Sequence, residues 1–168
     1  MRQWSRISRL SICGLVLLLV LQIGGWASAA VTANSAIFVQ TPKFPKVQLT
    51  NAMGSTPQTL YTCSANGTKI IGAFATSSDT SARDIQLSVL SGGVTYILNT
   101  TTVALNSGFV AGTLPVNLMN STNFPGLSLD ADGNQWFMCA SGDVIQAASL
   151  TTITSAKLIS VMLIAADF

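Results

Sequence analysis

The chain has 168 residues, of which 49% are apolar and only 8% are charged. A chain of this length fits one domain, and its charged share lies far below the roughly one quarter that is typical of soluble domains. It contains no histidine, and its six acidic residues are all aspartate. Because His and Glu do most general acid–base work, this composition argues against an enzyme, and nothing in the sequence calls for a cofactor.

The first 29 residues have the parts of a secretory signal peptide. Arg2, Arg6 and Arg9 form a basic start, an apolar core follows over residues 10–23, and residues 27–29 (Ala-Ser-Ala) fit a cleavage site. The core is short for a membrane span, which needs about 20 apolar residues. Cleavage is therefore favoured, and the alternative is an uncleaved hydrophobic helix that anchors the protein. Only in that second case is contact with a membrane expected.

Without residues 1–29 the chain keeps five basic residues against six aspartates, a net charge of −1. The basic character of the whole sequence thus belongs to its N-terminal segment. No basic face remains for a nucleic acid to use, so nucleic acid is excluded as a partner.

Apolar runs with a period of two dominate the rest of the chain. Ile85, Leu87 and Val89 alternate with polar residues, which predicts a strand with one buried face, and Gly92-Gly93 predicts a tight hairpin. We expect residues 30–58 to form an extended N-terminal arm. Strands are expected at 37–39, 60–63, 69–76, 83–90, 94–98, 101–105, 135–140, 144–148 and 157–165. Residues 109–129 are expected to form a long connection with one helical turn at 116–119.

This pattern predicts an all-β fold. Over residues 59–168 we expect a two-sheet antiparallel β-sandwich of the jelly-roll or Greek-key type, because roughly nine short strands with turn signals favour such architectures.

Two cysteines, Cys63 and Cys139, follow the N-terminal segment. An exported protein meets oxidising conditions, which would allow a disulfide between them. Two buried thiols are the equal alternative, because the sequence does not supply the Cβ geometry that a disulfide needs.

Asp130, Asp132 and Asn134 stand at alternate positions, as the first ligands of a calcium loop do. The rest of that pattern fails, since Gly133 comes too early and Ser141 stands where a bidentate Glu is needed. A hairpin turn is therefore favoured over a metal site. An aromatic sugar platform of Trp136, Phe137 and Tyr96 is likewise weighed against a core role, and the core role is favoured.

Three stretches carry a resemblance to a known group of proteins. They are NGTKIIGAFATSSDTSARDIQLSVLSGGVTYIL, LPVNLMNSTNFPGLSLDADGNQWFMCASGDVIQAA and KLISVMLIAADF. In this order they resemble small jelly-roll head-decoration or fibre-associated virion proteins of tailed phages, over roughly residues 60–168. The resemblance implies a non-enzymatic β-sandwich that packs on a shell or presents a binding surface. A signal-like segment departs from that group, whose members assemble in the cytoplasm.

Two functions follow as hypotheses. The first is an exported or virion-associated structural subunit for decoration or attachment, which forms homo-oligomers or a capsid or surface assembly. Its expected contact surface comprises loops 77–83 and 130–136, where substitution of Arg83 and Trp136 should weaken binding and leave the fold intact. The alternative is a periplasmic or cell-surface module that binds a glycan or acts as a pilus-like adhesin. A hydrolase is the least favoured hypothesis.

Overall fold

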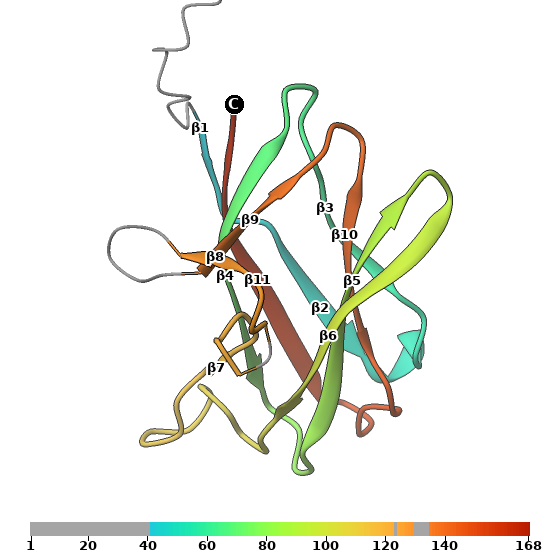
Figure 1. Cartoon of the computed structure of the whole chain (residues 1–168). Helices are drawn as coiled ribbons and strands as arrows, with labels where there is room; N and C mark the ends of the chain where they lie inside the picture. The colour runs from blue at the N-terminus through green and yellow to red at the C-terminus, as the bar shows by residue number, and fades with distance from the viewer. Residues whose placement is uncertain (1–40, 123, 130–134) are drawn as a thin grey trace, which may run out of the picture. The chain divides into compact units, whose positions relative to one another are not determined.

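A computed structural model describes residues 41–122, 124–129 and 135–168 of this chain. These residues form an all-β protein in which one antiparallel sheet has seven strands and the other has four (Figure 1). The predicted all-β architecture of two antiparallel sheets is thereby confirmed. Within the same ranges the helical structure amounts to one 3-10 turn, Asn51–Met53. The expected N-terminal helix and the expected strand at 37–39 lie outside the described residues.

The seven-stranded sheet is built around the pair β4 and β11. Its strands are β1 (Thr41–Lys43), β2 (Lys46–Thr50), β4 (Thr68–Ser77), β7 (Val116–Asn117), β8 (Ser128–Leu129), β9 (Gln135–Cys139) and β11 (Leu158–Asp167). The four-stranded sheet has the order β3 (Gln58–Thr62), β10 (Val144–Ser149), β5 (Arg83–Ser91) and β6 (Val94–Val103).

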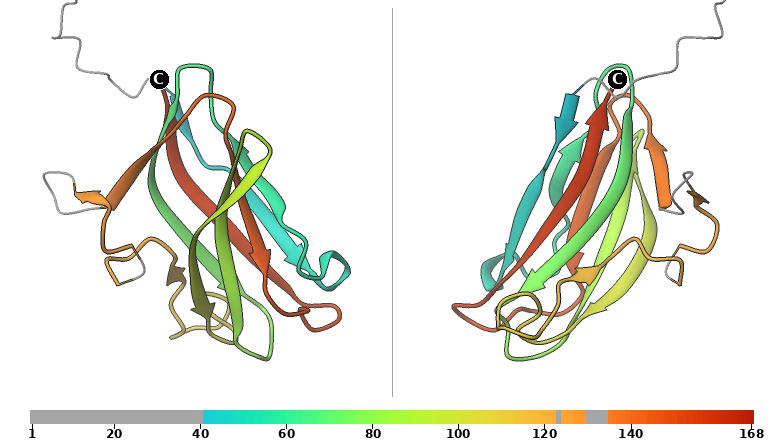
Figure 2. Two further views of the ribbon diagram at one scale, coloured as in Figure 1. Left: turned by 45° about the vertical axis from the view of Figure 1, so that its right-hand side comes forward. Right: turned by 90° about the vertical axis from the view of Figure 1, so that its left-hand side faces the viewer.

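The strand pairs are nested one inside another along the chain. The innermost pair is β5 with β6, and β4 with β9, β3 with β10 and β2 with β11 follow outward. Two further pairs, β4 with β11 and β5 with β10, join the halves of each sheet. The innermost turn is Gly92-Gly93, with φ of 57° and 82°, which side-chain-bearing residues rarely adopt. The chain thus runs out to this hairpin and back, alternating between the two sheets (Figure 2).

The inner faces of the two sheets meet in one apolar core. On β11 the inward residues Ile159, Val161 and Leu163 are at most 1% exposed, and Ile85 and Leu87 of β5 are also buried. The residues between them on β11 are half-buried. Period-two burial of this kind is what the sequence alternation predicts for a sandwich strand.

Residues 41–50 of the predicted N-terminal arm belong to the seven-stranded sheet. β1 and β2 both pair with β11, and Leu49 is buried in the core. Pro42 and Pro45 do not prevent this pairing, because β1 and β2 lie at the edge, where one side of a strand needs no ladder hydrogen bonds.

Two local predictions are wrong. The expected break between strands 94–98 and 101–105 is absent, and β6 runs on through a bulge at Leu98, where the register with β5 shifts. Asn99 is buried there, and its Nδ2 donates to the Leu118 carbonyl oxygen at 2.7 Å. The expected helical turn at 116–119 is replaced by β7, because pairing with Phe74 and Ala75 of β4 outweighs local preference.

Candidate interaction surfaces

A buried ion pair closes one end of the sandwich. The Arg83 Nε donates to Asp79 Oδ2 at 2.8 Å, and the Asp79 side chain is fully buried. Thr154 adds two hydrogen bonds to the same carboxylate, from Oγ1 at 2.6 Å and from its backbone N–H at 3.1 Å. The Asp79 carbonyl oxygen accepts from the Asn106 N–H at 3.0 Å. Asp79 therefore ties together three loops that lie far apart in the sequence.

Burial by itself would raise the pKa of Asp79. The hydrogen bonds from Arg83, Thr154 and the Ser81 backbone outweigh that effect and hold the pKa well below its ordinary value of 3.8. The carboxylate thus stays ionised over the physiological range, as a partner for a mostly buried guanidinium requires.

This geometry bears on the predicted contact residue Arg83. Its side chain is only 17% exposed, and its Nη2 donates to Thr154 Oγ1 at 3.1 Å. An Arg engaged in this way stabilises the loops that meet at Asp79. We therefore expect its substitution to destabilise this end of the sandwich rather than to remove a partner contact selectively. A contact role for Arg83 stays a prediction.

The second predicted contact residue, Trp136, lies on β9. It is partly buried, and the Lys69 Nζ lies 4.6 Å from its ring centroid, within the range of a cation–π interaction. Asp130, Asp132 and Asn134 lie outside the described residues. In the part of the chain that the structure describes, no three His, Cys, Asp or Glu residues gather as metal ligands would.

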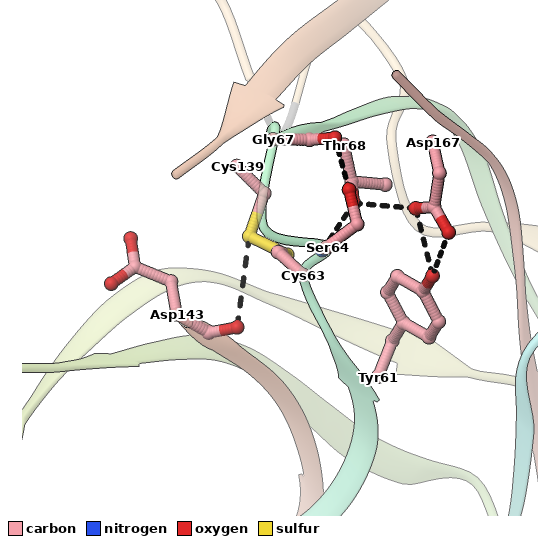
Figure 3. The surroundings of a disulfide bond; sticks show 8 residues. All are labelled: Tyr61, Cys63, Ser64, Gly67, Thr68, Cys139, Asp143 and Asp167. Carbon is pink, nitrogen blue, oxygen red and sulfur yellow. Dashed lines mark hydrogen bonds between the residues drawn. A yellow bond between two sulfur atoms is a disulfide. The ribbon is translucent and has the colours of Figure 1, made fainter. Parts of the chain in front are cut away.

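Cys63 and Cys139 are joined by a disulfide (Figure 3). Their Cα atoms lie 6.0 Å apart, and both residues are at most 4% exposed. Cys63 follows the last residue of β3, and Cys139 ends β9, so the bond links the two sheets. Only the tertiary structure brings these positions together, which is why the sequence left the choice between disulfide and thiols open.

A polar cluster beside the disulfide holds the C-terminal strand (Figure 3). The Tyr61 hydroxyl lies 2.7 and 2.8 Å from the two carboxylate oxygens of Asp167, and Thr68 Oγ1 donates to Oδ1 at 2.7 Å. Lys43 Nζ lies 3.7 Å from Oδ2. Burial and then the carboxylate raise the pKa of Tyr61 to about 12. Burial would raise the pKa of Asp167, but these donors and Lys43 lower it overall.

No sequence motif marks this cluster, since an aspartate next to the C-terminus is unremarkable by itself. Tyr61→Phe should remove the hydroxyl and raise the pKa of Asp167, which an NMR titration of its side-chain carboxyl carbon would measure. Loss of a hydrogen bond to a charged group should also cost about 1.5–3 kcal/mol of stability. Tyr96→Phe, on the exposed hairpin, is the matched control, and an unmoved Asp167 titration in Tyr61→Phe would contradict the assignment.

The edge of the four-stranded sheet is exposed at the hairpin end of β6, residues 94–97. This strand pairs only with β5 within the described ranges, and it is ten residues long. Val94, Tyr96 and Ile97 at its hairpin end are 52%, 55% and 64% exposed. It contains no charged residue and no proline.

A second apolar surface follows β6 directly, in the loop of residues 104–115. Leu105, Phe109, Val110 and Leu114 are between 50% and 81% exposed there. The loop is held in place, since Ser107 is buried, its Oγ donates to the Leu114 carbonyl oxygen at 2.7 Å, and its own carbonyl accepts from the Ser77 N–H at 2.8 Å. We call this segment, residues 104–115, the apolar loop.

Within the described ranges, no helix is long and apolar enough to cross a membrane.

No protein-family model matches the sequence. No curated protein matches it either. Among solved structures, the chain is similar to a pentameric capsid protein isolated from metagenomic phage sequences. The two are 17% identical, and the match covers 74% of this chain and 67% of that one, with a TM-score of 0.35. At this TM-score the likeness carries no conclusion about this chain.

Proposed function

We propose that this protein is a non-enzymatic structural subunit, a jelly-roll sandwich that assembles with copies of itself through β6. The nested strand pairs described above, shared between two sheets, support the jelly-roll assignment. The observation that carries the proposal is the exposed hairpin end of β6, residues 94–97, at the edge of the four-stranded sheet. A long edge strand without charged residues is a template for pairing with another chain.

The other edges of the sandwich support this choice by contrast. β1 is three residues long and contains Pro42, and β2 begins at the exposed Lys46. Short length, proline and lysine are the usual devices that keep an edge strand from pairing. β3, at the far edge of the four-stranded sheet, is half as long as β6. β6 has none of these three devices, although it carries the bulge at Leu98.

A second copy of the same chain is the occupant that we propose for this edge. In an antiparallel β6–β6 pair, the hairpin end of one strand faces the Val103 end of the other, where the apolar loop begins. Val94, Tyr96 and Ile97 of one copy would thus lie near the apolar loop of its partner. The low charge of the chain supports such pairing, since few like charges would meet across the two-fold axis.

Ile97→Lys should disrupt this association. The substitution places a charge on the exposed edge strand, so the purified protein should shift to monomer, with at least a tenfold weaker self-association in sedimentation equilibrium. Gln48→Lys adds the same charge at an exposed position of β2 and should leave the assembly unchanged. Equal association of Ile97→Lys, Gln48→Lys and the unaltered protein would contradict the proposal.

The proposal extends to an exported or particle-associated setting, for which residues 1–29 provide the support. N-terminal sequencing of the protein from its native source distinguishes the two cases. A chain that starts near Ala30 would indicate export, and a full-length chain in purified particles would indicate a virion component. A cytoplasmic full-length chain outside any particle would contradict both.

A further inference from the structure

A pocket of about 440 Å³ lies at a gap in the seven-stranded sheet. On one side of β4, β9 pairs with residues 68–70 and β7 pairs with residues 74 and 75. Between these two partners, Ile71 and Gly72 have no neighbouring strand on that side within the described ranges, and both line the pocket. The opening is thus built into the strand order and does not depend on β6.

The lining of the pocket is polar but uncharged. Asn117, Asn120, Ser121 and Gln135 supply amide and hydroxyl groups, and Ile71 and Leu129 supply apolar walls. Its volume lies within the roughly 300–1,000 Å³ range of small-molecule sites. The described lining contains no charged side chain that would offset the desolvation of a phosphate, a carboxylate or an ammonium group.

Backbone partners fix the orientation of two of these amides. Asn117 Oδ1 accepts from the Met119 N–H at 2.8 Å, which leaves its Nδ2 as a donor without a partner among the described residues. Gln135 Nε2 donates to the Phe124 carbonyl oxygen at 2.7 Å, which leaves Oε1 as a buried acceptor that no described group satisfies. An unsatisfied buried acceptor is costly, and a hydroxyl group that reaches it would relieve that cost.

We infer that this pocket binds a neutral saccharide of one or two rings. A sugar has hydroxyl groups that both donate and accept, as Asn117, Ser121 and Gln135 require, and C–H faces that fit Ile71 and Leu129. The inference is independent of the assembly proposed above. It also differs from a sugar platform on Trp136, which does not line the pocket.

The test uses ¹⁵N-labelled full-length protein and a panel of glucose, galactose, mannose, N-acetylglucosamine, lactose and maltose. We expect at least one sugar to shift the side-chain amide signals of Asn117 and Gln135 in a saturable manner. Asn117→Asp keeps an acceptor for the Met119 N–H but removes the free donor, so it should bind that sugar at least tenfold more weakly. Gln48→Glu introduces the same charge at an exposed site on β2 and should bind normally.

Two outcomes would overturn the inference. One is that no sugar of the panel produces saturable shifts at these side chains. The other is that Asn117→Asp, with an otherwise unchanged amide spectrum, binds like the unaltered protein. Ile97→Lys should keep sugar binding even when it abolishes self-association, so failure of one proposal leaves the other standing.

Discussion

Replacing Asp79 with asparagine should lower the free energy of unfolding at pH 7 by about 3–5 kcal/mol, the usual cost of breaking a buried ion pair. The asparagine has nearly the same shape, so the loss comes from the charge. Arg83, which is mostly buried, would be left without its counterion, and the three loops that meet at Asp79 would lose their common anchor. Urea unfolding followed by Trp136 fluorescence measures the effect.

The pH dependence of this effect has a definite sign. Because the folded-state pKa of Asp79 lies below the ordinary value of 3.8, its stabilisation is complete above that value and is lost as the pH falls below it. The difference in stability between the unaltered protein and Asp79→Asn should therefore be constant from pH 7 to about pH 5 and should shrink at about pH 3.

Asp84→Asn is the matched control for this experiment. Asp84 is exposed, and its carboxylate accepts a hydrogen bond from Thr102 Oγ1 at 2.6 Å. Exposed groups of this kind contribute roughly 0–1 kcal/mol. If Asp79→Asn cost no more than Asp84→Asn at pH 7, the buried pair would not be the anchor of this end of the sandwich.

Removing the disulfide should have an effect of similar size. The bond spans 76 positions of sequence, and a loop of that length implies about 4 kcal/mol of stabilisation through the unfolded state. The double variant Cys63→Ala, Cys139→Ala should lose close to that amount in urea unfolding. Alanine keeps the buried site apolar, so the loss reports the cross-link and not a buried hydroxyl group.

Dithiothreitol provides the internal check on the disulfide. It should lower the urea midpoint of the unaltered protein and leave the double alanine variant unchanged. Cys13→Ala, in the N-terminal segment, should behave like the unaltered protein. Equal midpoints of the unaltered protein with and without dithiothreitol would show that the bond does not form, or does not stabilise the fold, in solution.

The proposed self-association would depend on a smaller set of contacts, along β6 and the apolar loop. β6 is an edge because β5 pairs with one of its sides and no described strand pairs with the other. The apolar loop is held close to β4, since a Cβ atom added at Gly108, whose φ is 65°, would lie 2.7 Å from Thr76 Cγ2. A Gly108→Ala variant would disturb the loop as a whole, so a charge at Ile97 is the sharper probe of the interface.

The amino-acid sequence by itself determined the architecture. Period-two alternation in residues 83–90 and the Gly92-Gly93 turn are local signals, and local signals suffice to place strands and hairpins. The absence of histidine and the near-neutral charge also decide which functions are favoured as hypotheses. Both kinds of inference depend on nearest neighbours along the chain or on composition.

Only the tertiary structure decided which of these residues act together. The Asp79 carboxylate meets Thr154 across 75 positions, Tyr61 meets Asp167 across 106, and the cysteines pair across 76. No local pattern encodes such contacts, because they arise from strand order. For the same reason Arg83, which resembles a surface residue in sequence, lies against a buried carboxylate, and β6, which resembles any other strand, becomes the exposed edge.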